Sequence, residues 1–173
     1  VAVSDGGDWL RFTVGTDGEG RPTRLGALRQ GRLGGAGPGK RDSDAEEISR
    51  DGDGWLVAFE RDHRVWRHGS DLSQPGRAAA TPPALAGLAD NDGVEAMTRL
   101  ADGRLLLNSE GDDRDASSPA WLENGTGWRQ LSYPHHRLFR PTAAAARGGA
   151  GVLGREREDP RVAGRALRLV RLA

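Results

Sequence analysis

The chain has 173 residues, with 25 Lys and Arg against 25 Asp and Glu, so its formal net charge is zero. This balance gives no electrostatic basis for binding nucleic acid or an anionic membrane surface, because such binding depends on an excess of positive charge. The chain has no cysteine, which excludes a disulfide scaffold, a zinc finger and a thiol nucleophile. No apolar run is long enough to predict a membrane-spanning helix.

Short apolar segments follow one another along the chain and are separated by turns rich in glycine. The 26 glycines and 9 prolines are spread out, as is typical of many short elements. In chain order, strands are expected at residues 1–4, 9–14, 44–49, 55–60, 64–67, 93–98, 105–110, 120–122, 141–145, 152–156 and 165–172, with loops at 31–39 and 83–89. The sequence therefore predicts an all-β fold.

Part of this pattern repeats. One unit covers residues 44–60, a second covers 93–110, and a degraded third covers 141–156 with a turn at residues 148–149. The acids that end the second strand of each unit are Asp5, Glu60, Glu110 and Glu156, separated by 55, 50 and 46 residues. A period of this length with three or four strands per unit is typical of β-propeller blades. We expect an incomplete ring of three to four blades, in a single domain that is truncated at its N-terminus.

Short motifs also succeed one another in a fixed order along nearly the whole chain. They are Ser4–Leu10, Asp44–Glu46, Phe59–Trp66, Asn91–Ala96, Leu105–Glu110, Phe139–Thr142 and Glu156–Arg157. In this order and spacing they resemble the phytase-like family, also described as esterase-like activity of phytase. The resemblance implies a propeller-like domain over residues 1–173, in an exported bacterial protein that is secreted or periplasmic. It also implies hydrolysis of phosphate esters or other small-molecule esters. The chain departs from the family pattern at Gly6, where Arg is frequent, and at Ala143, where an acid is usual.

The candidate site is a ring of acids that recur at one point per blade and would converge on a central channel. The expected metal ligands are Asp5, Glu46, Glu60, Glu95, Glu110 and Glu156. Oxygen ligands without cysteine favour a divalent cation, with Ca²⁺ ahead of Mg²⁺. Glu46, Glu95 and Glu110 are the candidate catalytic residues, because a carboxylate near such a cation can act as a general base. The arginines expected to hold a phosphate through paired hydrogen bonds are Arg61, Arg64, Arg140 and Arg157.

A structural interpretation of the same acids stays open. The dipeptides Glu60-Arg61 and Glu156-Arg157 are suited to ion pairs that fasten one blade to the next, which would leave a non-catalytic module that binds a ligand or a protein. The histidine pair 135–136 is expected in a surface loop. The five tryptophans are expected to pack between blades, because each buries a large apolar area.

Overall fold

The computed structural model describes residues 1–111, 115–136, 139–147, 151–158 and 166–172. The predicted turn at residues 148–149 lies outside these ranges. Four antiparallel sheets of three or four strands account for nearly all the regular structure, and helical segments are few and short. The prediction of an all-β fold made of blade-like repeats is confirmed.

The strands follow the chain from sheet to sheet. Sheet one contains β1 (Ala2–Val3), β2 (Asp8–Thr16) and β3 (Pro22–Arg32), and sheet two contains β4 (Ala45–Asp51), β5 (Gly54–Phe59), β6 (Arg64–His68) and β7 (Arg77–Ala78). Sheet three contains β8 (Val94–Arg99), β9 (Leu105–Ser109), β10 (Ser117–Asn124) and β11 (Gly127–Pro134), and sheet four contains β12 (Phe139–Ala146), β13 (Val152–Glu158) and β14 (Leu167–Leu172). The two helical segments are α1 (Lys40–Ser43) and the 3₁₀ turn η1 (Pro83–Gly87).

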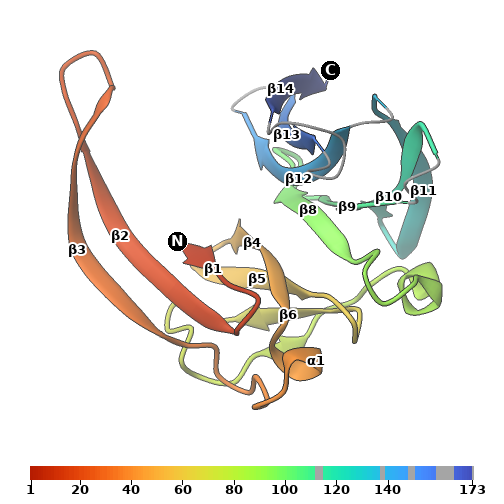
Figure 1. Cartoon of the computed structure of the whole chain (residues 1–173), viewed down its shortest axis with the longest axis horizontal. Coiled ribbons are helices and arrows are strands. Elements are labelled where there is room, and N and C mark those ends of the chain that lie inside the picture. The colour runs from red at the N-terminus through yellow and green to blue at the C-terminus, as the bar shows by residue number, and fades with distance from the viewer. Residues whose placement is uncertain (112–114, 137–138, 148–150, 159–165, 173) are drawn as a thin grey trace.

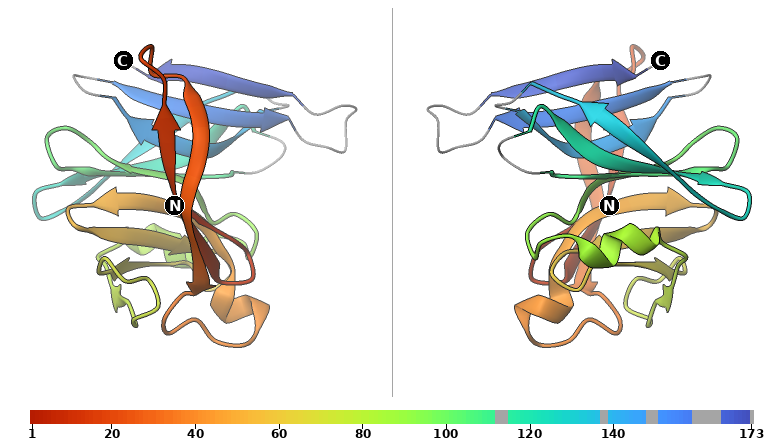
Figure 2. Two further views of the ribbon diagram at one scale, coloured as in Figure 1. Left: turned by 90° about the vertical axis from the view of Figure 1, so that its left-hand side faces the viewer. Right: turned by 90° about the vertical axis from the view of Figure 1, so that its right-hand side faces the viewer.

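The four sheets are arranged in an arc that does not close into a ring among the described residues (Figure 1). The first strands of consecutive sheets lie together, since β8 packs beside β4 on one side and β12 on the other. The long β2–β3 hairpin crosses the direction of the other strands in side view (Figure 2). In the part of the chain that the structure describes, no helix is long and apolar enough to cross a membrane.

Sheets two and three each pack on the preceding sheet through a row of three side chains on neighbouring strands, which we call the packing row. In sheet two the packing row is Ile48, Val57 and Trp66, which contact the cluster shared with sheet one. In sheet three it is Met97, Leu107 and Trp121, which are buried in the cluster shared with sheet two. Trp121 is a member of these clusters and the other four tryptophans pack against them, so the tryptophans pack between blades, as expected.

The structure differs from the sequence expectations at four places. Strands β3, β7 and β11 were not expected, and β3 takes in residues 31 and 32 of the predicted loop. These strands are mostly exposed, so they lack the alternation of apolar and polar residues that marks a half-buried strand. His135 is only 8% exposed, so only His136 of the pair is at the surface.

Candidate functional site

Two acids lie in β-bulges at the same position of neighbouring sheets. Strand β4 pairs with β5 on either side of Glu46, but Glu46 itself has no cross-strand partner. Strand β8 pairs with β9 around Glu95 in the same way. A bulge redirects the side chain of its extra residue, and bulges are frequent beside functional sites. The repeated bulge therefore turns both carboxylates toward one region between β4 and β8.

In sheets two and three, one more acid comes directly after the second strand: Glu60 follows β5, and Glu110 follows β9. The Glu60 backbone N–H donates to the carbonyl of Asp44 at 2.8 Å, and the Glu110 N–H donates to the carbonyl of Gly93 at 3.3 Å. Glu60 and Glu110 thus hold equivalent places in the two ladders. The chain then turns through a left-handed residue in each case, Arg61 with φ 64° in sheet two and glycine with φ 82° in sheet three.

These acids form two overlapping groups. Oxygen atoms of Asp44, Glu46 and Glu60 lie within 4.8 Å of one another, and so do oxygen atoms of Glu60, Glu95 and Glu110. Glu60 belongs to both groups and links them. We call these five residues the acid cluster. Five carboxylates so close together repel one another unless some bind protons or a cation shares their charge.

Glu95 shows this repulsion most clearly. Burial and, to a smaller extent, the negative charges of Glu46, Glu110 and Glu60 together raise the pKa of Glu95 to about 8. The guanidinium of Arg157 in sheet four opposes the rise. Glu95 therefore takes up a proton at neutral pH when no cation is present.

Two other members of the acid cluster, Glu46 and Glu60, also have raised pKa values. Burial raises the pKa of Glu46 to about 7, and the neighbouring charges of Glu60, Asp44 and Asp5 add to the effect. Burial also raises the pKa of Glu60, although Arg61 acts against it. Asp5 is itself exposed and lies at the edge of the cluster.

Asp44 is the most buried member of the acid cluster and was missing from the residues predicted from sequence. Its side chain is fully buried, with Oδ2 accepting a hydrogen bond from Arg61 Nε at 2.6 Å. Its Oδ1 lies 3.4 Å from Lys40 Nζ but has no hydrogen-bond partner among the described residues. Arg61 is therefore committed to a carboxylate of the cluster.

Gly93 is a second residue that sequence reasoning missed. It stands in sheet three where Asp44 stands in sheet two, as the two backbone hydrogen bonds above show. A β-carbon on Gly93 would lie 2.9 Å from Glu60 Cγ and 3.2 Å from Glu60 Cβ. The absence of a side chain at this position therefore makes room for Glu60 between the two groups. The one sequence feature that could have identified Asp44 and Gly93 is that each directly precedes the first strand of its repeat unit.

Sheet four carries Arg157 at the place of Glu60 and Glu110, and Arg140 at the place of Asp44 in sheet two and Gly93 in sheet three. Arg140 pairs with Arg157 across β12 and β13 in the register of Asp44 and Glu60. The bulged residue of β12, equivalent to Glu46, is Thr142. The sign of the charge therefore reverses from sheet three to sheet four. Arg157 is exposed, whereas Arg140 is 5% exposed with Nη1 at 3.4 Å from His135 Nδ1.

Glu156 is not brought into the acid cluster. It lies one residue before Arg157, inside β13, so the degraded third unit of the sequence repeat is one residue out of register. Glu156 is 2% exposed, and its Oε1 accepts a hydrogen bond from the hydroxyl of Tyr133 at 2.7 Å. Its other oxygen lies 3.6 Å from Arg168.

Arg64 is held by the protein rather than directed at the acid cluster. Its guanidinium donates to Asp62 Oδ2 at 3.1 Å and to the carbonyl of Asp42 at 2.6 Å. It also stacks over Phe59 and Trp66, at 4.1 and 4.8 Å from the ring centroids. Its contacts fasten the outer part of sheet two.

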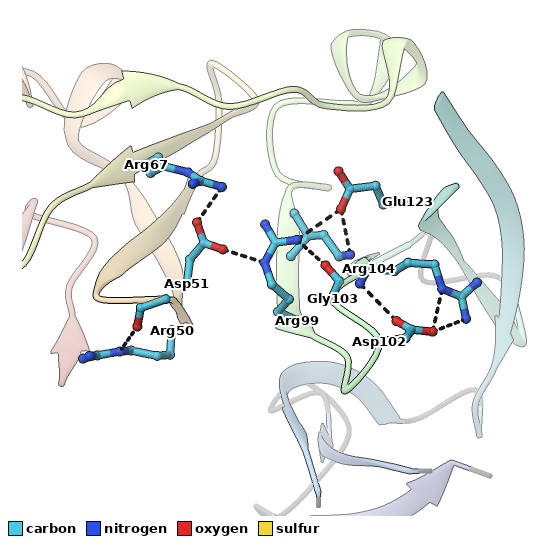
Figure 3. A network of polar contacts seen from close by, with 10 residues as sticks. Arg50, Asp51, Arg67, Arg99, Asp102, Gly103, Arg104 and Glu123 are labelled. Atoms are coloured by element: carbon cyan, nitrogen blue, oxygen red, sulfur yellow. Dashed lines mark hydrogen bonds and ion pairs between the residues drawn. The ribbon is translucent and has the colours of Figure 1, made fainter. Parts of the chain in front are cut away.

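An ion-pair network between blades occurs at the opposite end of β4 from Glu46 (Figure 3). Asp51 accepts a hydrogen bond from Arg99 Nε at 2.5 Å and pairs with Arg67 at 2.6 Å. Arg99 Nη1 lies 3.2 Å from Glu123 and donates to the carbonyl of Gly103 at 2.6 Å. Arg99 thus joins sheet two to sheet three. Fastening between blades was expected of Glu60 and Glu156. Asp51 forms this ion pair, and Glu156 links sheet four to sheet three through its hydrogen bond from Tyr133.

The comparisons with known proteins bear on this arrangement. A family model described as "Phytase-like: Esterase-like activity of phytase" matches residues 1–173. No curated protein and no solved structure matches the chain. Since the match extends over the whole chain and the blade-like repeats agree with it, the chain belongs to the phytase-like family.

Proposed function

We propose that this phytase-like chain hydrolyses phosphate esters, with a divalent cation held by the acid cluster. The observation that carries the proposal is the pair of carboxylate groups that share Glu60, each with oxygen atoms within 4.8 Å. The family resemblance supports the substrate class and also an exported, secreted or periplasmic location.

The residues present suit a hard cation. All donors of the acid cluster are carboxylate oxygens, which Ca²⁺ and Mg²⁺ prefer, and Ca²⁺ accepts the larger and less regular ligand sets. Asp44 supports the fit, because its buried Oδ1 has no hydrogen bond within the described ranges and is approached by Lys40 Nζ at 3.4 Å. Burial is the main cause of the raised pKa values of Glu46 and Glu95, and the negative charges of the neighbouring carboxylates add to it. We therefore propose Ca²⁺ as the resident ion.

We propose that Arg157 binds the phosphate. Arg61 is engaged with Asp44, Arg64 with Asp62, and the buried Arg140 with His135, whereas Arg157 is exposed. Arg157 is close enough to Glu95 to lower its pKa. A guanidinium can bind two phosphate oxygens at once and orient the ester beside the acids.

The proton transfers are assigned to Glu46. The cation would neutralise charge on the phosphoryl oxygens and on the attacking water. Glu46, with a pKa of about 7, can accept the proton of that water as its oxygen bonds to phosphorus. The bond from phosphorus to the alcohol oxygen then breaks, and Glu46 can pass the same proton on to the leaving oxygen. Glu95 and Glu110, deprotonated in the presence of the cation, would hold the cation together with Glu60.

A non-catalytic module is the second candidate. It is favoured by sheet four, where Thr142 replaces the bulged acid and Glu156 is occupied by Tyr133. In that case the acid cluster would bind a cation for stability, and the arginines would bind an anionic ligand without turning it over.

Turnover of 4-nitrophenyl phosphate and of its diester separates the two candidates. We expect activity that needs added Ca²⁺, is lost with chelator, and falls at least about 100-fold in Glu46→Gln, which loses the general base, or in Glu95→Gln, which loses a cation ligand. Glu19→Gln, an exposed acid on the β2–β3 hairpin, is the matched control and should keep full activity. Activity that is absent, or that survives chelator and both substitutions, would refute the hydrolase.

A further inference from the structure

A cavity of about 550 Å³ lies between sheets three and four. Sheet three contributes Leu106, Asn108 and Leu122 to its wall, and sheet four contributes Ala144 and Gly154. The wall is mostly apolar. This volume falls in the range of small-molecule sites, about 300–1,000 Å³.

The packing row explains why the space is there. Sheet four has Ala144, Gly154 and Val170 at the places of Met97, Leu107 and Trp121 in sheet three. All three side chains are much smaller than their counterparts. The sheet-two row of Ile48, Val57 and Trp66 is also large. Large side chains of the packing row fill the interfaces between sheets one and two and between sheets two and three. At the interface between sheets three and four the row has small residues, and the cavity remains.

The wall also contains polar groups with capacity for a ligand. Asn108 is 7% exposed, and its Oδ1 is buried without a hydrogen-bond partner in the described part of the chain. A buried amide oxygen without a donor is costly, at about 1–3 kcal/mol. Arg104 is neutralised by Asp102 at 2.7 Å, whereas Arg155 has no ion pair within 4 Å among the described residues, although its charge lowers the pKa of Glu47. Arg155 is exposed and donates to Thr142 Oγ1 at 3.1 Å.

We propose that this cavity binds a small organic anion with an aromatic or aliphatic body. The apolar body would fill the space vacated by the packing row, a donor group would reach Asn108 after a rotation of its amide, and the anionic end would meet Arg155. The site is separate from the acid cluster, and the proposal does not rest on the proposed hydrolase activity.

Filling the cavity tests the proposal. The probe is 8-anilinonaphthalene-1-sulfonate, an aryl sulfonate with a secondary amine, titrated into the folded full chain by fluorescence. Ala144→Met and Gly154→Val restore the bulk found in sheets two and three, whereas Ala145→Met places the same bulk on the exposed opposite face of β12. We expect each filling variant to weaken binding at least tenfold and to unfold at or above the wild-type temperature. Ala145→Met should bind as the wild type does.

Three results would overturn the proposal. The first is no binding by the wild type at millimolar probe. The second is an unchanged affinity for the probe in a filling variant that folds, since each of these substitutions occupies part of the cavity. The third is a signal lost in Leu28→Ser instead, because Leu28 is 65% exposed on the hairpin and offers the probe another apolar surface. Two filling variants on different strands keep the test decisive if one of them folds poorly.

Discussion

Replacing Glu95 with glutamine should stabilise the cation-free protein at alkaline pH. Burial and three neighbouring carboxylates raise the pKa of Glu95 from 4.5 to about 8. The folded state therefore holds this proton more tightly than the unfolded state does. The resulting stability is present below pH 4.5 and is lost as the pH rises to about 8. Glutamine is neutral at every pH and avoids the loss.

The size of the effect follows from the same shift. At about 1.4 kcal/mol per pKa unit, the whole rise corresponds to about 5 kcal/mol for one isolated group. Part of the rise in the pKa of Glu95 comes from its coupling to Glu46, Glu60 and Glu110, and its side chain is partly exposed. We therefore expect Glu95→Gln to increase the free energy of unfolding by about 2 kcal/mol at pH 8.5. At pH 4.5 the expected change is within about 0.5 kcal/mol.

Urea unfolding in chelator at pH 4.5 and pH 8.5 measures both values. Glu19→Gln serves as the control, because Glu19 is exposed and remote from the acid cluster, and it should change stability little at either pH. The reasoning fails if Glu95→Gln destabilises the protein equally at both pH values. That result would mean that the carboxylate is satisfied by the protein and does not require a cation.

Two further predictions concern residues that sequence analysis did not select. Gly93→Ala should leave the protein folded but weaken Ca²⁺ binding at least about tenfold, or about 1.4 kcal/mol, because the added β-carbon displaces Glu60. Calorimetric titration measures the affinity, and an unchanged value would contradict the prediction. Arg99→Ala should cost about 3 kcal/mol in urea unfolding, since it leaves the buried carboxylate of Asp51 with one partner. In a double-mutant cycle with Asp51→Ala the two losses should be non-additive, and strict additivity would show that the pair contributes nothing.

The bulged acids could be predicted from the sequence for a definite reason. Glu46 and Glu95 both precede their turn glycine by eight residues, and a hairpin with a fixed turn carries its register with it. Glu156 shows the limit of this method. A register shift of one residue, which the sequence does not reveal, places Arg157 rather than Glu156 at the acid position.

Other features depend on contacts between segments that are distant in the sequence. Asp44 and Gly93 matter because each ladder continues one residue beyond its strand, and spacing alone does not show this. The pair of Asp51 with Arg99 spans 48 residues and joins two sheets. The alanines of β12 were visible in the sequence, but only the register shows that Ala144 replaces Met97 in the packing row.

The central claim is that the acid cluster holds a divalent cation, and calorimetric titration of Ca²⁺ into the chelator-treated protein at pH 7.5 tests it most directly. We predict saturable binding with release of protons, because the raised pKa values of Glu46 and Glu95 must fall when the ion enters. Glu60→Gln should reduce the affinity at least tenfold, since Glu60 belongs to both carboxylate groups. Absence of binding at millimolar Ca²⁺, or binding that Glu60→Gln leaves unchanged, would contradict the claim.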